Sequence, residues 1–360
     1  MKWFGFWKRK YPRQNGRYFM KCCLLFVVAI VVVYSLLTNE DLNDASKKKN
    51  NHPKIFPERY VGKREIKRIL FWTNCYGSRT WQSLGDYSIP DAFKGCAVSK
   101  CIVTADKGLV SESDALLFHP PDFISTFFLP SVRAPEQIYV YASLEPPPNH
   151  LFANLIKDSN FFNWTLGYGS NMDVVVPYAH LKTLPTVNKY VGHIDFSKNK
   201  THKVAWAVGN CYPYFPRQLI AQELSKYIDV DIFGHCGKTN PKCSDRICPE
   251  VLGKYKFYLA FENSLCKEYV TEKFWNALIR GQIPIVRGGA DYTKVAPPNS
   301  FINVLDFPNI PKLAEYLHYL DQNQTAYNEY FKWKSHFAIG YTNWKCKLCE
   351  ALHDTVYFGI

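Results

Sequence analysis

The 360-residue sequence lacks both the low hydrophobicity of a disordered chain and any internal repeat. Hydrophobic residues make up 47% of it, which is enough for a sizeable core. The formal net charge is +13 at pH 7, but no basic stretch with interleaved aromatic residues runs through the chain. We therefore expect a folded protein, long enough for two domains, that does not bind nucleic acid.

Acidic residues are absent from residues 1–21, which contain seven lysines and arginines. An uncharged, apolar segment follows at 22–38, and sixteen residues of helix span about 24 Å, enough for a thin bilayer. The positive-inside rule then keeps the tail (1–21) in the cytosol and the rest in the lumen. A cleaved signal peptide is the alternative, but no small-residue cleavage site follows Leu37. We expect a single-pass type II protein of the Golgi membrane.

Residues 39–63 are polar, rich in lysine and asparagine, and show no apolar periodicity, which is typical of a stem that spaces a globular part from the membrane. Three glycosylation sequons follow the predicted anchor, at Asn163, Asn199 and Asn323. Their position agrees with a lumenal globular part.

A second C-x-x-C motif is also missing, although the chain has twelve cysteines. Cys22 and Cys23 lie in the predicted anchor, and the ten others favour lumenal disulfides. Cys346 and Cys349 form the one C-x-x-C pair, for which a redox motif or half of a zinc site is the alternative.

Short apolar segments bounded by Pro, Gly or Asp predict strands. They lie at 66–72, 101–104, 115–118, 137–141 and 173–177, and then at 204–208, 230–233, 255–261, 283–286 and 301–305. Helices are predicted at 217–228, at 270–280 and from 310 onward. This alternation indicates an α/β protein whose mostly parallel sheets are covered on both faces, with ligands beyond the carboxyl ends of the strands.

The most informative segment runs from Tyr255 to Leu278. An apolar strand ends in Glu262 and Asn263, and a short loop leads to Thr271, a suitable N-cap. Lys273 follows in the first helical turn, where backbone N–H groups and the helix dipole favour an anion. The pattern predicts a diphosphate site. The alternative is a capped helix on which Lys273 is a solvated surface charge.

This segment resembles the signature of the α1,3-fucosyltransferases of glycosyltransferase family 10, YKFYLAFENS-x-C-x-[DE]-Y-[VI]-T-E-K followed by N-A and G-x-x-P-[IV]-V. Every part is present, ending at Val286. Residues 203–210 with Arg217, 230–237 and 162–178 are similar to other blocks of the family. The resemblance covers the chain from about residue 66 to Cys349.

The resemblance implies a GT-B fold in which two Rossmann-like domains face a cleft. Residues 64–198 would form the acceptor-side domain and residues 199–360 the GDP-fucose-binding domain. Arg217 and Lys273 would contact the diphosphate, and the donor site would also be lined by Glu262, Asn263, Tyr269 and Glu272. Fixed cations suit this chemistry, because negative charge accumulates on GDP as the fucose C–O bond breaks.

Inversion at the sugar requires a base for the acceptor hydroxyl. The family places a glutamate after a strand in an E-S-P context, which corresponds here to Glu145. The alternative is a solvated loop glutamate. Two departures stand out: Pro146 replaces the usual Ser, and residues 168–173 lack the arginine and the middle aspartate of the family's Y-R-x-D-S-D block.

Asp229-Val-Asp231 has the D-x-D pattern that binds Mn²⁺ in many glycosyltransferases, but it begins a strand in a block typical of a family not organised around that motif. We expect no built-in metal, and a divalent cation such as Mn²⁺ or Mg²⁺ at most as a stimulant.

The resulting hypothesis is an inverting transferase that moves L-fucose from GDP-fucose to the 3-hydroxyl of a GlcNAc-type residue in a glycoprotein or glycolipid glycan. A catalytically silent glycan-binding relative and a lumenal thiol oxidoreductase are the alternatives. The sequence does not choose between a core GlcNAc, an antenna GlcNAc and a protein hydroxyl, and it does not give the oligomeric state.

Overall fold

The computed structural model describes residues 54–55, 64–81, 92–122, 129–149, 161–213 and 215–354. The predicted tail and anchor, and nearly all of the predicted stem, lie outside the described residues. Within those ranges, no helix combines the length and the apolar character that a membrane span requires.

The first sheet has six parallel strands in the order β3-β2-β4-β6-β7-β8. Their bounds are β2 (Lys67–Phe71), β3 (Cys101–Thr104), β4 (Ala115–Phe118), β6 (Ile138–Ala142), β7 (Trp164–Gly167) and β8 (Val174–Val175). All four residues of β4 are buried, as expected for a central strand that is covered on both faces.

The second sheet has five parallel strands in the order β11-β10-β12-β13-β14. Its strands are β10 (His202–Ala207), β11 (Val230–Phe233), β12 (Tyr255–Phe261), β13 (Ile283–Arg287) and β14 (Ile302–Asn303). Its helices are α2 (Arg217–Leu224), α3 (Pro249–Leu252), α4 (Glu272–Ile279), α5 (Ile310–Gln322) and α6 (Gln324–Glu329). The prediction of an α/β fold with parallel sheets is confirmed.

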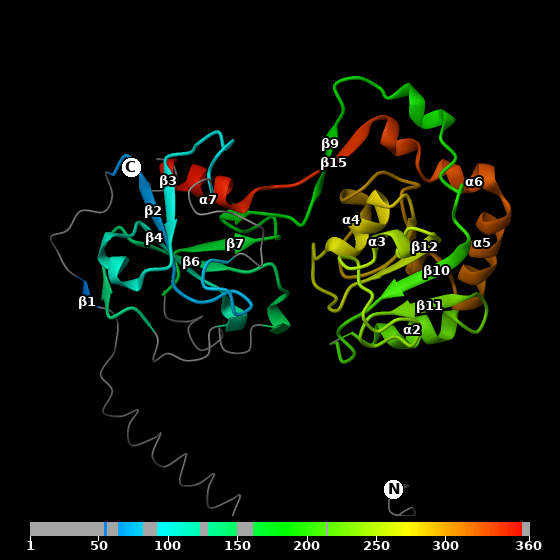
Figure 1. The fold of residues 1–360 in the computed structure, drawn as a ribbon, viewed down its shortest axis with the longest axis horizontal. Coiled ribbons are helices and arrows are strands. Elements are labelled where there is room, and N and C mark those ends of the chain that lie inside the picture. Colours follow the sequence, from blue (N-terminus) through cyan, green and yellow to red (C-terminus); the bar gives the residue numbers. More distant parts are fainter. Residues whose placement is uncertain are drawn as a thin grey trace, which may run out of the picture. The chain divides into compact units, whose positions relative to one another are not determined.

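Alternate residues of the second sheet point to its two faces. Phe257, Leu259 and Phe261 of β12 pack in one cluster with α2, α5 and α6, while Tyr258 and Ala260 pack in another with α3 and α4. Figure 1 shows α3 and α4 on one side of these strands and α5 and α6 on the other. This period of two is what a strand buried on both faces requires.

Two further strands join the two sheets along the chain. β9 (His180–Thr183) leads from the first sheet to the second, and β15 (Phe337–Gly340) leads back, and the two pair antiparallel. The chain then forms α7 (Trp344–His353), red in Figure 1, which lies beside the first sheet. Trp344 and Leu348 of α7 are buried in the core of that sheet.

The remaining elements are short. Two-residue strands occur at β1 (Lys54–Ile55) and β5 (Val132–Arg133). Connections contain 3₁₀ turns at Lys107–Glu112, Pro120–Asp122, Pro147–Asn149, Lys189–His193, Tyr292–Lys294, Val304–Asp306 and Lys332–Ser335.

Four disulfides confirm the prediction of structural disulfide bonds: Cys96–Cys346, Cys101–Cys349, Cys211–Cys236 and Cys243–Cys248. The two cysteines of the C-x-x-C pair bind different partners rather than each other. Cys349 joins α7 to Cys101 at the start of β3, and Cys346 joins it to Cys96 in the segment before β3, so both cysteines are structural and the thiol oxidoreductase alternative is wrong.

We expect the double variant Cys346→Ser/Cys349→Ser to lower the free energy of unfolding by about 2–5 kcal/mol, because its two bridges close nearly the same long loop, with sequence separations of 250 and 248 residues. Denaturant unfolding of the full chain measures this, with Cys266→Ser as the control outside the four bridges. Equal stability of the two variants would contradict a structural role for the two bridges.

Candidate active site

A cavity of about 840 Å³ opens at the carboxyl ends of the second sheet. Its walls come from the residues that follow β10, β11 and β12, from α2 and from the first turn of α4. Parallel sheets bind ligands at this edge. Four of the residues predicted for the donor site line this cavity together: Arg217, Asn263, Glu272 and Lys273.

Gly234 shapes the cavity wall after β11. Its φ is +82°, a conformation that favours glycine, and a Cβ added there would lie 2.6 Å from the carbonyl oxygen of Val208. The backbone of the two neighbouring strand ends can approach this closely only because no side chain stands between them.

Arg217 is a fixed cation in the cavity wall. Its guanidinium donates hydrogen bonds to the carbonyl oxygens of Phe261 (2.7 Å) and Asn210 (3.3 Å), and the residue is only 2% exposed. Burial lowers the pKa of Arg217, and Glu262 partly offsets this. An arginine still remains charged in a protein, so a positive charge is held at the end of β12.

Glu262 and Tyr269, which were also predicted for the donor site, do not line this cavity, and Glu262 anchors residues that do. The side chain is fully buried. Its carboxylate accepts hydrogen bonds from the backbone N–H of Thr271 (2.9 Å) and from the Thr271 hydroxyl (2.9 and 3.1 Å). The ammonium of Lys273 lies 3.4 Å from the same carboxylate. The strand end and the helix start are thereby joined.

Thr271 occupies the predicted N-cap position, but its side chain makes no capping hydrogen bond. The hydroxyl donates to Glu262 instead and accepts from the Lys273 ammonium at 2.8 Å. A buried carboxylate beside the N-terminus of α4 outcompetes the local cap, because bonds to charged groups are stronger than neutral ones.

Lys273 lies between two carboxylates, with its ammonium 3.0 Å from Glu272 and 3.4 Å from Glu262. Burial works to lower the pKa of Lys273, but these carboxylates outweigh it and raise the pKa. For Glu272, burial works to raise the pKa, and Lys273 brings it below its ordinary value. Lys273 is therefore charged and held in place.

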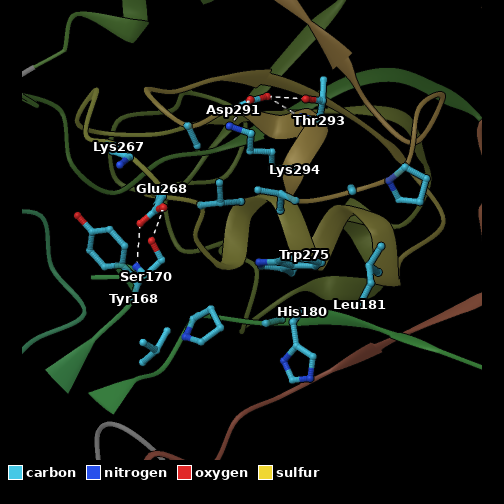
Figure 2. Close-up of a pocket in the computed structure, with 18 of the residues that line it drawn as sticks. Tyr168, Ser170, His180, Leu181, Lys267, Glu268, Trp275, Asp291, Thr293 and Lys294 are labelled. Atoms are coloured by element: carbon cyan, nitrogen blue, oxygen red, sulfur yellow. Dashed lines mark hydrogen bonds and ion pairs between the residues drawn. The ribbon is translucent and has the colours of Figure 1, made fainter. Parts of the chain in front are cut away.

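The loop between β12 and α4 is fastened to the first half of the chain. The Glu268 carboxylate accepts hydrogen bonds from the backbone N–H (2.8 Å) and the hydroxyl (2.7 Å) of Ser170, as Figure 2 shows. Glu268 has φ +60°, in the left-handed region. Next to it, Tyr269 is buried against Tyr168, with ring centroids 5.1 Å apart. The loop also forms a wall of a second cavity, of about 680 Å³.

Glu145, the predicted base, follows β6 at the carboxyl edge of the first sheet. Its carboxylate accepts a hydrogen bond from the Tyr76 hydroxyl at 2.8 Å, and its backbone N–H donates to the Ser143 hydroxyl at 3.0 Å. Burial raises the pKa of Tyr269, and the Glu145 charge raises it further. The structure thus brings the predicted base into electrostatic contact with a residue predicted for the donor site.

Comparison with known proteins agrees with this geometry. Residues 197–357 match the family described as "Glycosyltransferase family 10 (fucosyltransferase) C-term", and residues 64–179 match "Fucosyltransferase, N-terminal". The chain belongs to the family 10 fucosyltransferases.

Two curated relatives from Drosophila melanogaster illustrate the similarity. "Alpha-(1,3)-fucosyltransferase C" is 32% identical over 357 residues, covering 92% of this chain and 83% of the relative. "Glycoprotein 3-alpha-L-fucosyltransferase A" is 41% identical over 271 residues, covering 72% of this chain and 52% of the relative.

A solved structure titled "Crystal Structure of alpha1,3-Fucosyltransferase" shares the fold. The TM-score is 0.51 at 20% sequence identity, over 85% of this chain and 93% of that one. Because the alignment covers 85% of this chain, it includes residues of both sheets.

The departures from the family pattern have structural roles in this chain. Ser170, within the altered block, binds Glu268 as described above. Asp173 accepts hydrogen bonds from the backbone N–H (2.7 Å) and the hydroxyl (2.8 Å) of Thr165 on β7. Pro146 is buried. The altered block therefore supports the loop that carries Tyr269.

The other predicted sites are distributed over the surface and the sheet edge. In the D-x-D pair, Asp231 accepts a hydrogen bond from the Tyr255 hydroxyl at 2.8 Å, which favours the structural interpretation. Of the sequon residues, Asn199 lies in a turn with φ +66°, Asn323 caps α6, and Asn163 accepts from the backbone N–H of Tyr139. Their glycosylation stays a prediction.

Three contacts of the site were not predicted from the sequence: Tyr76 to Glu145, Ser170 to Glu268, and Thr271 to Glu262. Only the last lies within one motif. There, an acidic residue at the end of a predicted strand, nine residues before the predicted N-cap, was a weak signal for the contact. The other two join segments 69 and 98 residues apart, for which the sequence alone has no signal.

We expect Thr271→Val to lower the free energy of unfolding by about 2–4 kcal/mol, because it removes the hydroxyl that joins buried Glu262 to Lys273. Thr293→Val is the matched control, since this threonine is exposed and bonds only Asp291 among the described residues. Chemical denaturation compares them. If both variants unfold alike, the proposed anchoring by Glu262 is wrong.

Proposed function

We propose that this chain transfers L-fucose from GDP-fucose, with inversion, in α1,3 linkage to a GlcNAc-type residue of a glycoprotein or glycolipid glycan. The observation that carries the proposal is the cavity beside α4, where two held cations, Arg217 and Lys273, share the wall with Asn263. Arg217 Nε and Asn263 Oδ1 are buried there and have no hydrogen-bond partner among the described residues. Unpaired buried polar atoms are costly unless a ligand satisfies them.

The diphosphate of the donor fits this cavity by charge and by position. The cavity lies at the N-terminus of α4, where the helix dipole favours an anion. As the bond between fucose C1 and the phosphate oxygen breaks, negative charge grows on GDP. Arg217 and Lys273 are already oriented by their own partners, so their stabilisation of that charge needs little reorganisation.

Glu145 is the proposed base. It takes the proton from the acceptor hydroxyl as that oxygen attacks C1 on the face opposite GDP, which inverts the configuration. Tyr178 supports the position of Glu145 near Tyr269, because its hydroxyl donates to the carbonyl oxygen of Leu144 at 2.8 Å and its ring centroid lies 6.2 Å from that of Tyr269. In this proposal the two cations stabilise the leaving group, no metal is built in, and a divalent cation such as Mn²⁺ or Mg²⁺ only stimulates.

The full chain, solubilised in detergent, tests the activity with labelled GDP-fucose and a panel of glycan acceptors. We expect Glu145→Gln to bind GDP-fucose normally while transfer falls by about 100-fold or more. Lys273→Ala should weaken donor binding itself. Glu136→Gln and Lys267→Ala are matched controls, since both residues are exposed and lie outside the donor cavity.

Donor binding without transfer to any acceptor would favour a catalytically silent glycan-binding relative. Absence of GDP-fucose binding by the wild-type chain would contradict the proposal as a whole.

The proposed setting is the Golgi membrane, with a single anchor at 22–38 and a lumenal catalytic part. Basic residues before the anchor and the four disulfides support this orientation. We expect the part after the anchor to resist added protease in sealed vesicles, and we expect endoglycosidase to reduce its mass. Asn199→Gln and Asn323→Gln should each remove part of that reduction. Digestion of the catalytic part in intact vesicles would reverse the proposed topology.

A further inference from the structure

Three neighbouring strands of the first sheet end close to Glu145. β2 leads to a turn at Tyr76, β4 leads to His119 and Asp122, and β6 leads to Glu145 itself. Because β2, β4 and β6 are adjacent and parallel, their carboxyl ends meet at one edge. The groups around the proposed base thus come from separate parts of the sequence.

Tyr76 occupies an unusual backbone conformation. Cys75 and Ser78 exchange two backbone hydrogen bonds of 2.9 and 3.0 Å around a two-residue turn, in which Tyr76 has φ +50° and Gly77 φ +78°. Both central residues of such a turn have positive φ, which favours Asn or Gly over tyrosine. Tyr76 is therefore a strained residue in a turn that Asn or Gly would fit better. Backbone strain of this kind concentrates at functional sites.

Asp122 holds the turn in place. One oxygen of its carboxylate accepts from the backbone N–H of Tyr76 at 2.7 Å and lies 2.6 Å from Nδ1 of His119. His119 is buried, and its backbone N–H donates to the Thr73 hydroxyl at 2.7 Å. Burial lowers the pKa of His119, so the ring is neutral and its Nδ1–H donates to Asp122.

The Tyr76 hydroxyl is the end of this chain of contacts, and it donates to Glu145 at 2.8 Å. Tyr76 is 53% exposed, and its ring lies edge-on against that of His119, with centroids 4.8 Å apart. Partial desolvation of the side chain, together with the Glu145 charge, raises the pKa of Tyr76, so the group stays a phenol and a donor. The titratable groups whose charges interact with Tyr76 or Glu145 are Cys75, His119, Asp122, Tyr168, Tyr178 and Tyr269.

We propose that Tyr76 is a positioning residue for the transfer reaction: its phenol, fixed through Asp122 and His119, orients the Glu145 carboxylate toward the acceptor hydroxyl. This inference rests on the proposed function of Glu145 as the base. A carboxylate after a loop has several rotamers, and one directional hydrogen bond selects among them.

Steady-state kinetics of the full chain in detergent test this role. We expect Tyr76→Phe to lower kcat by about tenfold to a hundredfold, the range for one hydrogen bond to a charged group. KM for GDP-fucose and the melting temperature should stay at wild-type values, because the ring and the donor cavity are unchanged. Tyr190→Phe, on an 80% exposed tyrosine, is the matched control. Asp122→Asn is a second variant that weakens the anchor of the turn, with a smaller expected loss of kcat.

A double-variant cycle separates positioning from a general structural role. If Tyr76 acts through Glu145, then Tyr76→Phe lowers the residual rate of Glu145→Gln no further. An equal fold-loss in both backgrounds, or a wild-type kcat for Tyr76→Phe, would overturn the inference while the proposed function stands. Absence of transfer by the wild-type chain would instead overturn the proposed function, and this inference with it.

Discussion

The ion pair between buried Glu262 and Lys273 is the interaction on which the proposed donor side depends. A buried carboxylate is tolerated only when its oxygens are satisfied, and Thr271 supplies both a backbone N–H and a hydroxyl. Glu262 directly follows β12, and Lys273 lies in the first turn of α4, so the pair fixes the helix start relative to the strand end. The part of the cavity wall formed by Asn263 and the first turn of α4 is thereby held at the edge of the sheet.

Other carboxylates of the molecule likewise accept a hydrogen bond from the backbone N–H of a distant segment. Asp122 holds the turn at Tyr76, and Glu268 holds the altered block at Ser170. A further example is Asp114, which accepts from the backbone N–H of Arg68. Loops have few backbone partners of their own, so a charge-assisted bond is an effective way to order one. Disulfides also join segments that are far apart in the sequence: two of them connect α7 to β3 and to the segment before it.

The sequence predicted those elements whose signal is local. Four strands match their predicted bounds residue for residue, since each is a short apolar run bordered by polar residues: β3, β4, β11 and β12. α2 ends at Leu224 rather than at 228, because Ser225 and the residues after it form a turn. β9 and β15 were not predicted, since each is ordered by the other across more than 150 residues. The packing of α7 against the first sheet, inside the range predicted for the second domain, has the same non-local origin.

The site divides in the same way. On its proposed donor side, Asn263, Glu272 and Lys273 come from one segment that a sequence motif contains, and Arg217 is added from α2. The proposed acceptor side is assembled from Tyr76, the His119–Asp122 turn and Glu145, which only the order of β2, β4 and β6 brings together. If the proposed role of Glu145 is correct, substitutions in those turns change the acceptor side without altering the Glu262–Lys273 ion pair. A family built in this way can vary its acceptor through scattered loop positions while its donor motif stays recognisable, which explains why this sequence indicates the donor clearly and the acceptor hardly at all.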